Sequence, residues 1–94
     1  MRKYHLREGV VLVEICGEFL LVATRNARKY CRYYYQINET AAYYWKKMEQ
    51  EPDLEKVIAA ASADYKISEE EIRPGFMAFL DSLEKEGYLI WNAE

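Results

Sequence analysis

Two hydrophobic periods meet at Asn38, and this change constrains the fold more than any other feature of the sequence. Residues 10–37 are rich in β-branched and aromatic residues, which short breaks containing Gly or Asn interrupt, as is typical of strands. After Asn38, apolar residues recur at helical spacing, as in Leu54, Val57 and Ile58. The chain is therefore predicted to be an α+β domain in which strands come first and helices follow.

The part before Asn38 is predicted to be a three-stranded antiparallel meander, with strands at residues 10–16, 19–24 and 30–37. Gly17 with Glu18 is expected to form the first tight turn, and residues 25–27 the second. The third strand then lies at an edge of the sheet, where its backbone N–H and C=O groups can pair with another chain.

Three helices are expected after the strands. Asn38 is an N-cap for the first helix, and Asp53 restarts the chain as the cap of a second helix that ends by Tyr65. Ser68 and the glutamate three residues later form a capping box that opens the third helix. The apolar stripe of this helix is predicted to consist of Ile72, Phe76, Phe79, Leu80 and Leu83.

The third helix contains a Pro-Gly pair. Gly87 is predicted to close this helix as a C-cap. Pro74 removes a backbone hydrogen bond and Gly75 is a weak helix former, so the sequence predicts a kink or a late start.

Length and composition predict one domain over residues 1–94. The 51% hydrophobic and 31% charged content indicates a folded globule that buries a core without disulfides. No apolar stretch is long enough to span a bilayer or resembles a signal peptide, so the protein is expected to be cytoplasmic and not membrane-bound.

Charge is divided unevenly along the chain. Residues 1–37 carry seven Lys/Arg against three Asp/Glu, whereas residues 38–94 carry six against thirteen. Because phosphate contacts need clustered cations, the helical half is not expected to bind nucleic acid.

Residue types that carry catalysis are scarce. His5 is the one histidine, in an N-terminal segment expected to be frayed, and Cys16 and Cys31 are interpreted as buried strand residues too far apart for a disulfide. The glutamates at residues 69–71 are explained by the helix dipole rather than by acid/base chemistry. The sequence therefore predicts a protein that is not an enzyme, with no metal site and no cofactor.

The predicted edge strand, residues 30–37, is rich in tyrosine. Alternation places its residues on two faces, an inner one with Cys31, Tyr33, Tyr35 and Ile37 and an outer one with Tyr30, Arg32, Tyr34 and Gln36. Such an edge could accept an extended peptide as an added strand. Equally, Arg32 and the bulky aromatics could simply blunt the edge against aggregation.

The segment from Ile37 to Ala42, Ile-Asn-Glu-Thr-Ala-Ala, followed by Trp45 resembles the hallmark of PqqD-like proteins, which lies at a strand-to-helix junction. Residues 54–67 and 79–90 resemble the second helix and the closing segment of that family. The chain departs from the family pattern at residues 50–52 and at Pro74-Gly75.

This resemblance implies a winged-helix-like domain, three strands followed by three helices, that binds the leader of a ribosomally made precursor peptide. The leader would add as a strand to the third strand and lie against the third helix. Carried onto this sequence, the strand side would be Arg32, Tyr33, Tyr34, Tyr35 and Gln36, and the helix side Arg73, Phe76, Met77 and Leu80. Asn38, Thr40 and Trp45 would serve as cap, turn and core anchor.

The implied partners are the precursor peptide and a modifying enzyme, a radical S-adenosylmethionine protein in the family's pattern. A winged-helix DNA-binding regulator is one alternative, although the Glu-rich start of the third helix disfavours it. Another is an accessory subunit that binds a folded partner through the same edge. The edge could also pair two copies into a homodimer.

Overall fold

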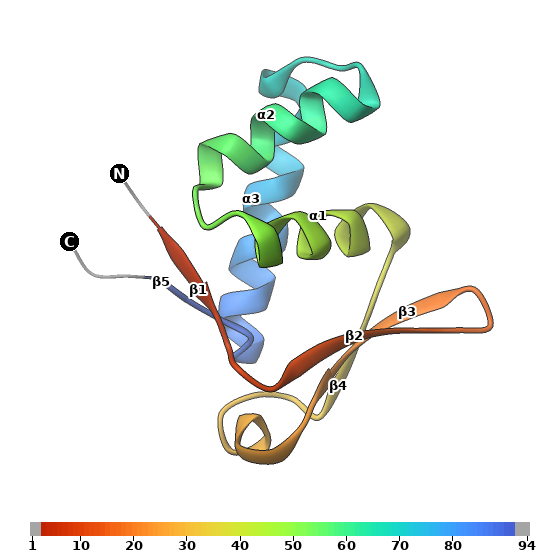
Figure 1. Ribbon diagram of the computed structural model, residues 1–94, viewed down its shortest axis with the longest axis vertical. Helices are drawn as coiled ribbons and strands as arrows, with labels where there is room; N and C mark the ends of the chain where they lie inside the picture. The colour runs from red at the N-terminus through yellow and green to blue at the C-terminus, as the bar shows by residue number, and fades with distance from the viewer. Residues whose placement is uncertain (1–2, 92–94) are drawn as a thin grey trace.

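The computed structural model describes residues 3–91 (Figure 1). It confirms an α+β fold in which a three-stranded antiparallel sheet precedes three helices. The elements in chain order are β1 (Tyr4–Leu6), β2 (Val10–Ile15), β3 (Glu18–Ala23), the 3-10 helix η1 (Arg25–Lys29), β4 (Tyr34–Ile37), α1 (Glu39–Gln50), α2 (Leu54–Tyr65), α3 (Glu69–Glu86) and β5 (Leu89–Trp91).

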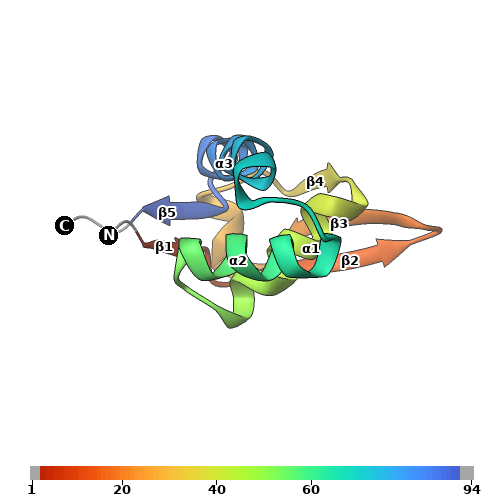
Figure 2. The ribbon, with the colours of Figure 1, turned by 90° about the horizontal axis from the view of Figure 1, so that it is seen from above.

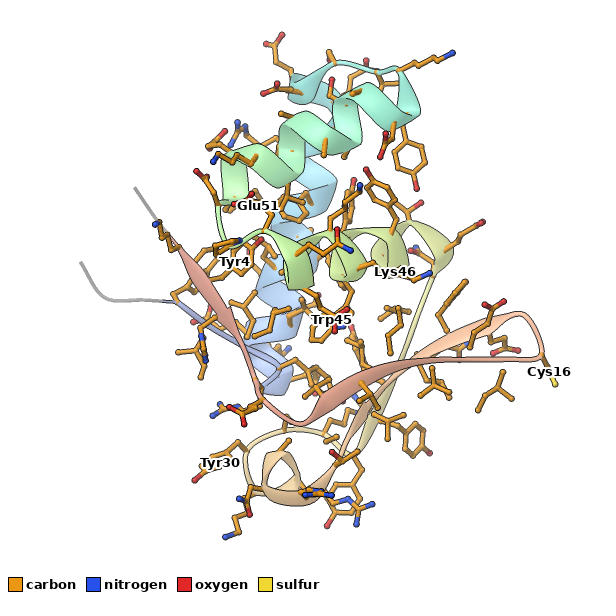
Figure 3. All side chains as sticks on the ribbon, viewed as in Figure 1. Tyr4, Cys16, Tyr30, Trp45, Lys46 and Glu51 are labelled. Atoms are coloured by element: carbon orange, nitrogen blue, oxygen red, sulfur yellow. The ribbon has the colours of Figure 1, made fainter. Side chains whose placement is uncertain are left out.

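The β2–β3 hairpin turns one residue earlier than predicted. Ile15 pairs with Glu18, so Cys16 and Gly17 are the two turn residues, with φ of 52° and 80°. Positive φ at both positions is what a two-residue turn matched to the strand twist requires. The prediction that Cys16 is a buried strand residue is therefore wrong: its thiol is free and exposed at the hairpin tip (Figure 3).

The connection to β4 is longer than a turn, and β4 is shorter than predicted. The backbone forms η1, whose Ala27 is buried, and the N–H of Cys31 donates to the carbonyl of Ala27. Residues 30–33 are irregular, so the strict alternation expected there fails, and Tyr33 is 62% exposed rather than inward.

The two ends of the described chain form a second sheet that the sequence did not indicate. Strand β1 pairs antiparallel with β5, with Tyr4 opposite Trp91 (Figure 1). The prediction of a frayed N-terminal segment is wrong because Tyr4 is buried and its hydroxyl donates to the carbonyl of Glu51.

The helix boundaries follow the predicted caps. The Asn38 side chain accepts from the N–H of Ala41, and Ser68 with Glu71 forms the capping box. Helix α3 runs without a break from Glu69 to Glu86, and Gly87 is its C-cap in the left-handed conformation. The predicted late start is therefore wrong, and the predicted kink stays a prediction. Because α3 begins at its capping box, its apolar stripe reaches the core along most of its length.

The core lies between the sheet and the helices. Its largest fully buried side chains include Trp45 of α1, Phe76 of α3, Leu21 of β3 and Tyr88 before β5. Seen from above, the β2–β3 hairpin extends away from this core, with β4 beside α3 (Figure 2). Among the described elements, no helix covers the face of the sheet that is turned away from this core, and β4 is one of its two edge strands.

Candidate functional site

Strand β4 presents an open sheet edge. It pairs with β3 alone, and the N–H of Ala23 donates to the carbonyl of Tyr33 at 2.8 Å. In an antiparallel ladder the residues that bond across alternate with residues whose backbone groups point away. The register therefore turns the N–H and C=O groups of Tyr34 and Gln36 outward, away from β3.

The edge is closed at one end by the C-terminus of α3. The N–H of Arg32 donates to the carbonyl of Glu86 at 3.2 Å, and the carbonyl of Arg32 accepts from the Tyr88 hydroxyl at 2.7 Å. The Arg32 guanidinium also lies 3.6 Å from the Glu86 carboxylate. Because both backbone groups of Arg32 are occupied, the edge open to a new strand spans residues 34–36.

Gly87 makes this closure possible. Its φ of +93° disfavours residues with a side chain, and a Cβ there would lie 2.8 Å from the Cα of Cys31. Residues 30–31 thus run directly against the end of α3. The side of β4 that lies toward α3 is therefore fixed at this end.

One flank of α3 faces β4. Arg32, just before this strand, contacts Glu86, and spacings of four and seven residues put Ser82 and Phe79 on the same side of α3 as Glu86. Figure 2, which views α3 nearly end-on, shows β4 on one side of this helix and β5 on the other. Phe79 is half-buried, and its ring lies 6.2 Å from the ring of Tyr44.

Aromatic rings lie at the end of β4 that α3 closes. Tyr35 is half-buried and stacks on Tyr88 with ring centroids 6.0 Å apart. Arg32 lies over the Tyr35 ring, 5.8 Å from its centroid. Burial raises the pKa of Tyr88 to about 12, so its hydroxyl remains protonated at neutral pH and keeps donating to Arg32.

The structure brings together the five residues predicted for the strand side. Tyr33, Tyr34 and Gln36 are exposed along the edge or beside it. Tyr35 is half-buried on the inner face of the sheet, and Arg32 lies at the closed end of the edge.

The four residues predicted for the helix side are placed elsewhere. Phe76 and Leu80 have 0% exposure and belong to the core. Arg73 donates two hydrogen bonds, of 3.0 and 2.6 Å, to Glu55 on α2, and Met77, one turn later, shares that flank. The spacing of Phe76 and Leu80 correctly marks the buried side of α3. Arg73 and Met77 lie on the flank toward α2, opposite the flank that carries Glu86.

Sequence reasoning missed Ser82, Glu86 and Tyr88 at this site, and it assigned Phe79 to the core stripe alone. Phe79 lies at the margin of that stripe, which was the available signal. The roles of Glu86 and Tyr88 depend on contacts with Arg32, more than fifty residues away in the sequence.

The Cys31 thiol, in the segment that leads into β4, is partly buried. Burial raises the pKa of the Cys31 thiol, whose Sγ donates to the carbonyl of Ala27, so a reactive thiolate is disfavoured. Within residues 3–91, no group of three His, Cys, Asp or Glu side chains is placed to hold a metal ion. No helix in the same range is long and apolar enough to cross a membrane.

The fold and this site define an α+β domain in which three helices follow a three-stranded sheet that has an accessible edge. The family model described as "Coenzyme PQQ synthesis protein D (PqqD)" matches residues 18–89, and the chain belongs to this family. The match covers β3 to α3 and ends at Leu89, the first residue of β5.

A solved structure described as "TbiB1 in Complex with the TbiA(beta) Leader Peptide" has a similar fold. Its TM-score is 0.73 at 19% sequence identity, over 95% of this chain and 98% of that one. The similarity extends to the β1–β2 region that the family match leaves out. No curated protein matches the chain.

Proposed function

We propose that this protein binds the leader segment of a precursor peptide as an added strand on β4 and presents the precursor to a modifying enzyme. The observation that carries this proposal is the open edge at Tyr34 and Gln36, which the end of α3 closes only as far as Arg32. Membership of the PqqD family supports it, as does the leader peptide named in the complex of similar fold.

The proposed peptide-binding groove lies between β4 and α3, and we assign separate roles to its two sides. On the strand side, Arg32, Tyr33, Tyr34, Tyr35 and Gln36 supply the edge and its flanking rings. On the helix side, we assign the contacts to Phe79, Ser82 and Glu86, in place of Arg73, Phe76, Met77 and Leu80, because these four are buried or lie on the other flank. Backbone pairing would set the register of the leader, and the Phe79 ring would cover its apolar side chains.

The protein is proposed to act without catalysis and with no cofactor of its own. The chemistry would reside in a separate enzyme, and the family pattern favours a radical S-adenosylmethionine enzyme. We place this activity in the cytoplasm, where a ribosomally made precursor first becomes available.

A pair of substitutions at Gln36 tests the edge. Proline is tolerated on an edge strand where its missing N–H faces solvent, so Gln36→Pro removes an outward donor without breaking the β3–β4 ladder. Gln36→Ala is the matched control, because it removes the same side chain, including its hydrogen bond to Glu18, and keeps the N–H.

The readout is titration with a synthetic leader of the precursor encoded beside this protein, followed by calorimetry and by amide shifts. We expect Gln36→Pro to weaken binding about tenfold relative to Gln36→Ala, since a lost hydrogen bond leaves the peptide carbonyl unpaired. Equal affinities for the two variants, or leader-induced shifts that leave residues 34–36 unchanged, would contradict strand addition on β4.

The DNA-binding alternative gains no support from the structure. The first turn of α3 exposes Glu69, Glu70 and Glu71, and carboxylates in this position repel phosphate. The basic residues of η1 lie on a different part of the molecule.

A further inference from the structure

The face of the β2–β3–β4 sheet that is turned away from the helices is apolar. The helices cover the other face, where Val10, Leu21 and Ile37 are buried. The outward face is exposed instead: Val11 is 45% exposed and Tyr34 67%. An apolar face of this kind on a small domain indicates a surface that another molecule covers.

Strand register arranges this outer face in rows. Residues that pair across an antiparallel sheet lie on the same face. Val11, Val22 and Tyr34 form one row across the three strands, Val13, Leu20 and Gln36 form the next, and Ile15 with Glu18 closes the hairpin end. We call these eight residues the outer face.

The two ends of the outer face carry opposite charges. At the η1 end, Arg28 is held beside the face: its Nε donates to the carbonyl of Ala23 at 3.3 Å, and its guanidinium lies 5.5 Å from the Tyr33 ring centroid. Arg28 also lines a shallow apolar hollow with Leu20 and Val22. At the hairpin end, Glu18 is exposed, and its carboxylate accepts from the Gln36 amide.

We propose that two copies of this chain stack their outer faces about a two-fold axis that lies between the sheets and runs across the strands. Rotation about this axis brings the η1 end of each copy over the hairpin end of the other. Arg28 of each copy then faces Glu18 of the other, while the apolar rows meet at the centre. Two packed sheets lie about 10 Å apart, a distance that long Arg and Glu side chains span.

A second copy fits this surface because the face is complementary to itself. A two-fold interface requires one patch to match its own inverted copy, and opposite charges at the two ends with apolar residues between them satisfy that requirement. The axis leaves the open edge of β4 uncovered. Dimer formation is thus compatible with peptide binding and does not depend on it.

The size of the face sets the strength of the dimer. Six residues along a strand and three strands across give a patch of about 20 Å by 14 Å. This is smaller than the roughly 800 Å² per partner of a standard stable interface. We therefore expect a dissociation constant of about 10 to 100 μM, and a monomer in dilute solution.

Sedimentation velocity on the full chain, from about 5 μM to about 1 mM, measures this equilibrium across the expected range. Glu18→Arg and Arg28→Glu should each weaken the dimer about tenfold, because each variant places like charges opposite one another at both ends. The double variant restores both opposite-charge pairs and should return the dissociation constant to within about threefold of the wild-type value.

Glu14→Arg is the matched control for Glu18→Arg. It makes the same charge change on the same hairpin, but Glu14 pairs with Phe19 on the opposite face, so association should not change. Leu20→Glu at the centre should abolish the dimer, with folding verified by circular dichroism.

Two results would overturn the proposal. One is a monomer throughout the concentration range. The other is association that survives Leu20→Glu or that the double charge swap fails to restore, which would point to pairing through the β4 edge.

Discussion

The two flanks of α3 differ in what they face. On one flank, Arg73 reaches Glu55 of α2, and this exposed ion pair fastens one helix to another. On the other, Glu86 holds the segment that leads into β4, and Phe79 lies on the same side of the helix. The two flanks are about equally polar and equally spaced from the core stripe, so the difference lies in the neighbouring element and not in the helix itself.

The largest loss of stability is expected at the end of α3, where Gly87 lies against residues 30–31. Gly87→Ala should lower the free energy of unfolding by about 2 kcal/mol or more, because the new Cβ would clash with the backbone of Cys31 and would occupy a strained φ. Urea denaturation followed by circular dichroism measures the change.

Gly17→Ala is the control for Gly87→Ala. Gly17 also has positive φ, at +80°, but no atom lies within 4 Å of the position that a Cβ would take there, so only the φ cost of about 1 kcal/mol applies. Equal losses of stability in the two variants would show that close approach at Gly87 is unimportant.

The affinity for the leader peptide should show directly which flank of α3 contributes to binding. Phe79→Ala is expected to weaken binding of the synthetic leader about tenfold, or about 1.4 kcal/mol, because it removes the ring that borders β4. Met77→Ala truncates another half-buried side chain of α3 on the opposite flank and should change the affinity less than about twofold.

Calorimetry measures both affinities below the temperature at which either variant unfolds. If Met77→Ala weakened binding as much as Phe79→Ala, the helix side inferred from the sequence would be favoured.

Tyr88→Phe should cost about 1 kcal/mol of stability, since the carbonyl of Arg32 loses its hydroxyl donor. The effect is pH-dependent. The pKa of Tyr88 is raised above its usual value near 10 to about 12 in the folded state, so its contribution is present below pH 10 and is lost as the pH rises toward 12.

Urea midpoints measured from pH 8 to about pH 12 test this sign. The difference between wild type and Tyr88→Phe should shrink as the pH rises. A difference that grew with pH would contradict the donor role of this hydroxyl.

The smallest expected effect is a gain in stability. Gly75 lies inside the continuous helix α3, and no atom lies within 4 Å of a Cβ placed there. Gly75→Ala should therefore raise the free energy of unfolding by about 0.5 to 1 kcal/mol through helix propensity, with no change in leader affinity. Thermal unfolding measures it, and a loss of stability would indicate that Pro74 imposes a local distortion that alanine cannot accept.

Local signals accounted for the elements whose structure depends on nearby residues. Asn38, Asp53 and Ser68 cap the helices where the sequence placed them, since a cap needs only an acceptor side chain and the next few N–H groups. The β1–β5 sheet was missed because its pairing joins Tyr4 to Trp91 across almost the whole chain. The sequence predicted that β4 begins at residue 30, four residues too early, because residues 30–33 have a strand-like composition. In the structure, Arg32 in this segment bonds instead to the end of α3.

The sequence by itself determined that a three-stranded sheet precedes three helices, and it located the inward stripe of α3 and an edge strand, because hydrophobic period and capping act over a few residues. Only the tertiary structure decided which flank of α3 borders that strand and how much of the strand is open. Those two properties depend on Arg32, Glu86 and Gly87 meeting across distant parts of the chain. A helical period specifies the side that is buried but leaves both flanking sides equivalent until a neighbour packs against one of them.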